Sequence, residues 1–298
     1  MSLVSAPVIA GIVLAVLIGL SLGLLGGGGS ILTVPILVYV IGVPAHEAIA
    51  LSLLVVGTTS LAALVPHARS GAVRWKTGAL FGATSMAGAY GAGKLAYLVP
   101  ATVLLLLFGA MMLVTAVAMM RGRKAADHAG PEGRARGLPI AMIVLEGLVV
   151  GAVTGLIGAG GGFLVVPALV LLARLPMRAA VGTSLLVIAM KSFAGFAGYL
   201  ESVSVDWPLA AAVTSAAVLG SFAGGALSGR IPQGLLRRAF AWFIVVMAVF
   251  ILVQEVPRAL GIEVELATTW PLVLGASAIP LALAVLDLAR RQRAAAYS

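Results

Sequence analysis

Lys191 is the residue whose type and position most clearly suggest chemistry, because it lies well inside the apolar segment 177–199. If that segment crosses a membrane, a lysine there is energetically costly and typically functional. Its ammonium group could attract an anion, form an ion pair with Glu146 of the segment 138–158, or extend to the membrane edge. The first interpretation makes Lys191 a substrate ligand, and Glu146 is kept as a proton or charge partner.

Hydroxyl side chains occur on two segments of similar sequence, 46–66 and 177–199. The polar side chains considered on them are Ser52, Thr58, Thr59, Ser60, Thr183, Ser184, Lys191 and Ser192. Spacings of seven and eight residues place several of these on one helical face, where they could line a polar path. Alternatively, the hydroxyls bond to carbonyl groups of their own helix. The members predicted to bind substrate are Ser52, Thr59, Thr183, Ser184 and Lys191.

Two glycine clusters, at 26–30 and 158–162, are the third feature suited to binding. A glycine run in lipid does not hold a helix unless protein or water covers its backbone, so we expect the chain to break there. The next helix would begin with free N–H groups and a positive dipole end, which favour an anion. Close helix packing is the alternative. The predicted ligands are Gly27, Gly28, Gly29, Ser30, Gly160, Gly161 and Gly162.

These features occur in pairs because the chain contains an internal duplication. Residues 23–60 align without a gap with residues 155–192, an offset of 132, and nearly half of the aligned positions are identical. The same offset aligns Trp75 with Trp207. Such self-similarity indicates two copies of one structural unit, each with a glycine-rich interruption between apolar segments.

The composition places these features in a membrane. Apolar residues make up 61% of the chain and charged residues 10%, against roughly 25% charged in soluble domains. Several apolar runs reach the roughly 20 residues that a spanning helix needs, and they lack the alternation of a β-barrel. The sequence therefore predicts an all-α integral membrane protein in contact with the lipid bilayer.

The charge pattern and the residue types exclude several functions. The net charge of +9 comes from basic residues in short loops, so membrane topology explains it and we expect no nucleic-acid partner. The chain has no cysteine, which rules out disulfides and thiolate chemistry. Because no metal-ligand set or nucleophile–base pair is evident, we expect neither an enzyme nor a cofactor.

We expect eleven apolar segments, of which two are too short to span a membrane. They are residues 3–25, 31–42, 46–66, 77–98, 101–120, 138–158, 163–174, 177–199, 208–228, 235–253 and 268–287. The segments 31–42 and 163–174 would each make roughly 18 Å of helix, against a hydrocarbon core of roughly 30 Å. They resemble half-helices that start within the membrane. Whether each glycine-flanked pair crosses twice or forms a re-entrant hairpin stays open.

The predicted division of the chain follows from the repeat. Residues 1–120 form the first transmembrane repeat and residues 121–137 a cytoplasmic linker. Residues 138–254 form the second repeat. Residues 255–298 form an extracytoplasmic loop, one extra transmembrane helix and a basic cytoplasmic tail.

Loop charges predict that the two repeats have opposite orientations. The loop 67–76 carries three basic residues and belongs inside, whereas its equivalent at 199–208 carries Glu201 and Asp206 and belongs outside. The N-terminus is then outside and the C-terminus cytoplasmic. Inverted repeats with broken helices are typical of secondary transporters.

The motif GGGGSILTVPILVYVIGVPAHEAIALS, and its second copy GAGGGFLVVPALVLLARLPMRAAVGTSL, resemble the sulfite exporter TauE/SafE family over nearly the whole chain. The resemblance implies a bacterial inner-membrane permease for sulfite, sulfoacetate, sulfolactate or related organosulfonates. The family pattern Gly-Thr-Ser is kept at 182–184 but becomes Ala-Leu-Ser at 50–52. The second copy is therefore expected to contribute more to the site.

The function predicted from these observations is a secondary transporter that exports small sulfur-containing anions by alternating access. The alternatives are a permease for another small anion, a proton-coupled uptake carrier, a cation carrier, an anion channel or an intramembrane enzyme. Small-residue spacings around Gly88 and Gly220 indicate helix packing, with a homodimer as one way to use them.

Overall fold

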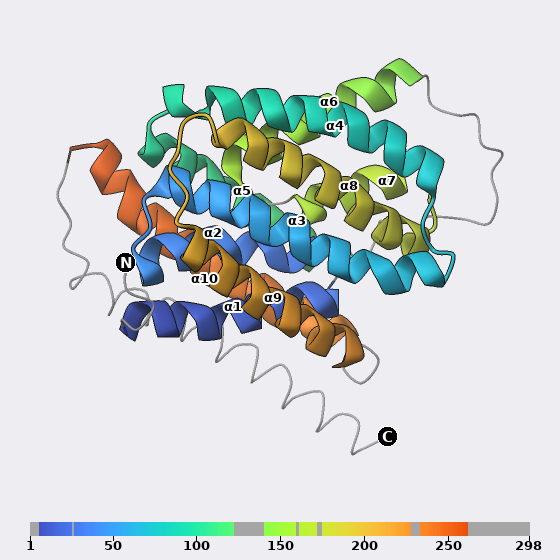
Figure 1. The fold of residues 1–298 in the computed structure, drawn as a ribbon, viewed down its shortest axis with the longest axis horizontal. Helices are drawn as coiled ribbons and strands as arrows, with labels where there is room; N and C mark the ends of the chain where they lie inside the picture. Colours follow the sequence, from blue (N-terminus) through green and yellow to red (C-terminus); the bar gives the residue numbers. More distant parts are fainter. Residues whose placement is uncertain are drawn as a thin grey trace. The chain divides into compact units, whose positions relative to one another are not determined.

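The computed structural model describes residues 6–25, 27–121, 140–158, 161–171, 175–227 and 233–261, and these ranges contain helices and no strand (Figure 1). The predicted all-α architecture is therefore confirmed. The elements are α1 (Ala6–Leu25), η1 (Gly27–Leu32), α2 (Thr33–Pro35), η2 (Ile36–Ile41), α3 (Ala45–Arg69), α4 (Trp75–Leu95), η3 (Ala96–Leu98), α5 (Ala101–Arg121), α6 (Ile140–Ile157), α7 (Gly162–Leu171), α8 (Met177–Tyr199), α9 (Trp207–Leu227) and α10 (Gln233–Ala259).

Three helices in the described ranges are long and apolar enough to cross a membrane. They are Ala45–Arg69 in α3, Ala179–Tyr199 in α8 and Trp207–Gly224 in α9. The predicted linker beyond Arg121 and the predicted final segment 268–287 lie outside the described residues. The chain is thus a helical membrane protein with a polar residue, Lys191, in one of its spanning helices.

Contacts divide the chain into two compact units. One contains α1 to α4 and α6 to α9, and the other contains most of α5 together with α10. In the second unit, Gly109 of α5 packs against Leu252 of α10. All of the described residues that we predicted to bind substrate belong to the first unit.

Equivalent helices begin at equivalent residues. The bounds of α4 and α9 coincide under the offset of 132, and α3 and α8 begin directly after Pro44 and Pro176. Both prolines have extended ψ angles, 142° and 144°, so each directs the chain into its helix from the same conformation. Proline suits this place because its fixed φ and missing N–H are compatible with a helix start.

Contacts between helices repeat as well. Gly220 of α9 abuts the backbone of Val16 in α1, and the equivalent Gly88 of α4 abuts Leu148 in α6. A Cβ at either glycine would overlap a backbone oxygen of the neighbouring helix. These small residues therefore pack helices of the same chain closely together, as is common in membranes.

The equivalent helices α3 and α8 pack against each other in opposite directions. Leu53, in the first half of α3, contacts Gly195 near the end of α8. Ala72, just after α3, contacts Gly182 near the start of α8. Contacts that pair an early residue with a late one at both ends define an antiparallel pair.

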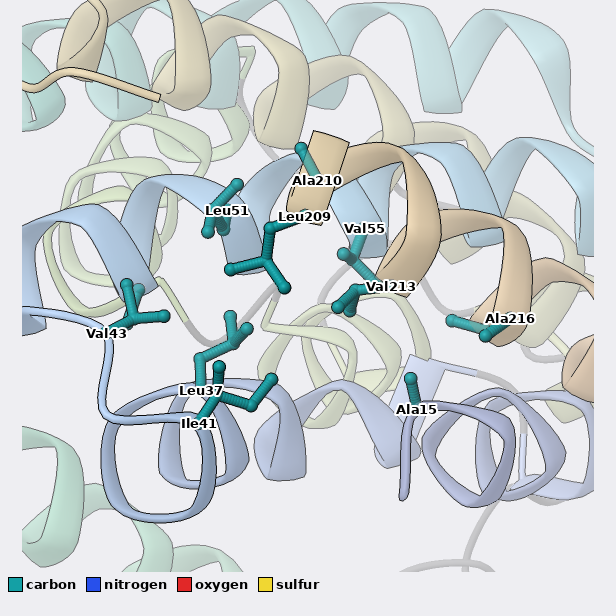
Figure 2. Close-up of a cluster of buried hydrophobic side chains, with 12 residues drawn as sticks. Ala15, Leu37, Ile41, Val43, Leu51, Val55, Leu209, Ala210, Val213 and Ala216 are labelled. Atoms are coloured by element: carbon teal, nitrogen blue, oxygen red, sulfur yellow. The ribbon is translucent and has the colours of Figure 1, made fainter. Parts of the chain in front are cut away.

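An apolar cluster fixes the position of the first short segment (Figure 2). Its buried members are Ala15, Leu37, Ile41, Val43, Ala48, Leu51, Val55, Leu209, Ala210, Val213, Ala216 and Ala217. They come from α1, η2 and the turn after it, α3 and α9. Because Leu37 and Ala15 share this cluster, the segment after the first glycine cluster returns along α1.

The first glycine cluster differs from the predicted break. Gly27–Leu32 form a 3₁₀ helix, which continues through α2 into the π-helix Ile36–Ile41. The helical segment therefore begins inside the cluster and not at residue 31. A 3₁₀ helix pairs backbone groups between residues three apart, so it satisfies N–H and C=O groups that a loop would leave unpaired.

Candidate functional site

The first glycine cluster contacts the short helix that begins at the end of the second cluster. η1, which contains Gly27 to Gly29 and the buried Ser30, contacts both α7 and α8. α7 begins at Gly162, the last residue of the second cluster. The two short segments, which belong to different repeats, therefore contact each other.

The second cluster is a break with two left-handed residues. Gly158 has φ 74° and Gly161 has φ 62°, values that glycine adopts without steric cost. The carbonyl of Gly161 accepts hydrogen bonds from the N–H groups of Leu164 (3.0 Å) and Val165 (2.9 Å), which starts α7. Gly160 lies outside the described residues. By helix geometry, the N–H groups of Gly162 and Phe163, which precede these two bonded residues, have no partner within the helix.

α7 is a short helix that packs against α8. It has 10 residues and is therefore about 15 Å long, half the thickness of the hydrocarbon core. Its buried Val165 and Leu169 share an apolar cluster with Val187 and Ile188 of α8. The start of α7 is thus covered by protein.

Lys191 lies at this break. Its side chain is 1% exposed, and Nζ donates a 2.7 Å hydrogen bond to Oγ1 of Thr154 on α6. Thr154 donates its own hydroxyl hydrogen to the carbonyl of Val150 at 2.6 Å, so it accepts from the lysine. A Cβ at Gly161 would overlap Nζ, which shows how closely the break approaches the amine.

The predicted alternative of an ion pair between Lys191 and Glu146 is not present among the described side chains. Glu146 lies two turns before Thr154 on α6, about 12 Å along the axis, and is half-buried. Lys191 reaches the threonine instead. Its complete burial in the protein also leaves no extension toward a membrane edge.

Ser52 connects the first repeat to the second break. Its hydroxyl donates to the carbonyl of Gly158 at 2.6 Å, with the carbonyl of Ile49 as an alternative acceptor at 2.8 Å. The equivalent Ser184 bonds to Val181 of its own helix at 2.8 Å. α3 therefore holds the break of the other repeat in place.

The other predicted hydroxyls form bonds away from Lys191. Thr59 bonds to the carbonyl of Val55 in its own helix at 2.7 Å. Thr183 accepts a 2.9 Å hydrogen bond from the backbone N–H of Arg74, two turns along α8 from Lys191. The structure thus brings together Lys191, Gly161 and Ser52 around the break but not Thr183.

Thr154 is the neighbour of Lys191 that sequence reasoning missed. It lies four residues before Gly158, in a segment where it is the one hydroxyl residue between positions 140 and 157. A lone threonine one turn before a glycine break was the available signal. It is not repeated, because the equivalent residue of the first copy is Leu22.

A polar cluster joins the end of α4 to the turn after α8. Lys94 forms a 2.8 Å ion pair with Glu201, and the hydroxyl of Tyr90 donates to the same carboxylate at 3.0 Å. The hydrogen bond from Lys94 and then that from Tyr90 lower the pKa of Glu201. These groups are exposed and connect the two repeats.

Residues 11–251 match the protein family described as sulfite exporter TauE/SafE. A probable membrane transporter protein of Xylella fastidiosa (strain 9a5c) is 35% identical over 239 residues, covering 79% of this chain and 91% of the relative. One of Bacillus subtilis (strain 168) is 26% identical, covering 75% and 91%. One of Methanocaldococcus jannaschii is 27% identical, covering 80% and 94%. No solved structure matches the chain.

Proposed function

Because the chain belongs to the sulfite exporter TauE/SafE family of membrane transporters, we propose that it exports a small sulfur-containing anion across the bacterial inner membrane. Sulfite and organosulfonates such as sulfoacetate are the substrates proposed. Their oxygens carry negative charge, and the site around the second glycine break offers a cation and hydrogen-bond donors to such groups.

The observation that carries this proposal is the environment of Lys191. Its amine is buried and has one neutral partner, Thr154, among the described residues. A buried ammonium with so little compensation is unfavourable, and an anionic substrate would supply the missing charge. The helix start at Gly162 adds N–H groups and a positive dipole end beside it.

The proposed mechanism is alternating access between two inverted repeats. Three observations support it: the coincident helix bounds, the repeated glycine contacts and the antiparallel packing of α3 with α8. Ser52 and Lys191 approach the same break from opposite repeats, so relative movement of the repeats would alter the site.

Export is the direction that the membrane potential favours. With the cell interior negative, outward movement of one negative charge is favoured by roughly 2.3 kcal/mol per 100 mV. An exporter of this kind needs little or no coupling to another ion, whereas uptake would need protons or sodium.

The first prediction tests the role of Lys191. We expect Lys191→Ala to abolish sulfite and sulfoacetate flux in proteoliposomes, because it removes the positive charge that the buried site offers. Lys94→Ala is the matched control, since it removes the same charge from an exposed ion pair outside the site. Normal flux through a folded Lys191→Ala protein would contradict the proposal.

A further inference from the structure

Ser60 of α3 and Ser192 of α8 are buried serines whose hydroxyls have no hydrogen-bond partner. This is unusual for serines and threonines in these helices. Ser184 and Thr59, for example, bond to carbonyl groups one turn earlier in their own helices. A buried hydroxyl without a partner costs about 1–3 kcal/mol, so its presence at two places needs a reason.

The two serines are equivalent residues of the two repeats, since 60 and 192 differ by the offset of 132. Other buried hydroxyls without a partner are those of Thr33, Ser85 and Thr214. Their equivalents in the other repeat are Val165, Ala217 and Gly82, which carry no hydroxyl. Among the described residues, an unpaired hydroxyl is therefore duplicated at this position alone.

Ser60 lies on the face of α3 that contacts α8. One turn earlier, Gly57 abuts the ring of Phe193, and one turn later, Leu64 packs with Leu185. The residue seven positions earlier, Leu53, also contacts α8. Positions three, four and seven residues apart share a helical face, so Ser60 faces α8.

Ser192 lies on the corresponding face of α8. Ile188, one turn earlier, shares a buried cluster with Val56 of α3, and Gly195, one turn later, abuts Leu53. The pairs on either side, Leu64 with Leu185 and Leu53 with Gly195, place Ser60 and Ser192 within about one helical turn of each other along the antiparallel pair.

We propose that the hydroxyls of Ser60 and Ser192 are a pair of anion-binding donors at the crossing of α3 and α8. This inference rests on the proposed function. An oxyanion offers several acceptor oxygens, so each serine can donate one hydrogen bond to it. Ser192 directly follows Lys191 in the chain, which places the charged and neutral donors on adjacent positions of one helix.

The pair has a further property in an alternating-access cycle. In such a cycle the two repeats exchange conformations, so each residue takes the environment that its equivalent had before. Ser60 and Ser192 are equivalent to each other, and the same pair of hydroxyls therefore stays at the crossing of α3 and α8. Lys191 has Thr59 as its equivalent and does not share this property. The serine pair therefore holds the anion in both the inward-facing and the outward-facing state.

The test is calorimetric titration of the purified full chain with sulfite under anaerobic conditions and with sulfoacetate. We expect Ser60→Ala and Ser192→Ala each to weaken binding about tenfold, because each removes one hydrogen bond to a charged acceptor. The matched control is Ser221→Ala. Ser221 is also buried in a helix, but its hydroxyl bonds to the carbonyl of Val218 at 2.8 Å.

Thermal unfolding without ligand separates binding from structure. Alanine removes an unpaired buried group, so we expect the unliganded Tm of both variants to stay level or rise. Unchanged affinity for both anions would overturn the inference. If Lys191→Ala alone weakens binding, the proposed function stands and the serine pair is wrong. If the unaltered protein binds neither anion, the proposed function falls and this inference falls with it.

Discussion

At the scale of single residues, the place of Lys191 depends on the missing side chain of Gly161. A Cβ there would overlap both Nζ of Lys191 and the methyl group of Thr154. The left-handed φ of 62° would remain unfavourable for any other L-residue. The glycine thus provides both the turn and the space for the amine.

We therefore predict that Gly161→Ala destabilises the protein and displaces the amine from Thr154. Gly71→Ala is the matched control, because Gly71 also has a left-handed φ of 68° but nothing within 4 Å of the added carbon. The control should cost about 1–2 kcal/mol for the backbone conformation alone. Thermal unfolding of the two variants checks this, and an equal loss in both would contradict the close approach at Gly161.

Lys191 could be chosen as a candidate site residue from the sequence, because a charged residue in an apolar segment is visible without a structure. Its partner was not predicted. The sequence favoured Glu146 because its charge is opposite to that of lysine, whereas the residue that lies within hydrogen-bond distance is Thr154. Ser52 shows the same limit. Its position on a polar face was expected, but its bond to Gly158 joins residues 106 positions apart, which spacing within one segment does not reveal.

At the scale of elements, helices bounded by proline were predicted well. The segment predicted at 177–199 is α8 with the same bounds, because Pro176 ends the preceding turn and a polar turn follows Tyr199. The first glycine cluster was predicted less well. The low helix propensity of glycine argues against a helix there. Because the segment contacts α1, its backbone groups still need hydrogen-bond partners, and Gly27–Leu32 form a 3₁₀ helix.

The cluster of Lys94, Tyr90 and Glu201 is an element-scale contact with a pH dependence. The folded protein holds the pKa of Glu201 below its ordinary value of 4.5, chiefly through the hydrogen bond from Lys94. A carboxylate with a lowered pKa stabilises the fold at pH values above its ordinary pKa, and this contribution disappears as the pH falls through the lowered value.

We predict that Glu201→Gln lowers the Tm slightly at pH 7 and has no effect at a pH low enough to protonate Glu201 in the native protein. The effect is small because both charges are about half exposed, at 53% and 48%. Thermal unfolding across this pH range, in low salt, checks it. A difference that persists at the acid end would show that the glutamine acts through packing and not through charge.

At the scale of the whole molecule, the duplication gives one sequence unit two environments. α3 and α8 begin at equivalent residues and face each other, while their polar residues have diverged: Lys191 stands where the first copy has Thr59. The fold needs the shared glycines and prolines in both copies. The asymmetric charge is present once, so the proposed site is built mainly on the second repeat.

The opposite orientation of the repeats is directly testable because Ser70 and Ser202 are equivalent, exposed residues in a chain without cysteine. Each hydroxyl bonds to a carbonyl three residues earlier, so both occupy the same kind of turn after their helix.

We predict that a membrane-impermeant maleimide applied to intact cells labels Ser202→Cys and not Ser70→Cys. The latter should react only after permeabilisation, because the positive charges around it retain its loop inside. Both variants should react fully in detergent, with the unaltered chain as the unlabelled control. Labelling of both cysteines from the same side would mean that the repeats share one orientation, and the alternating-access mechanism proposed for them would be wrong.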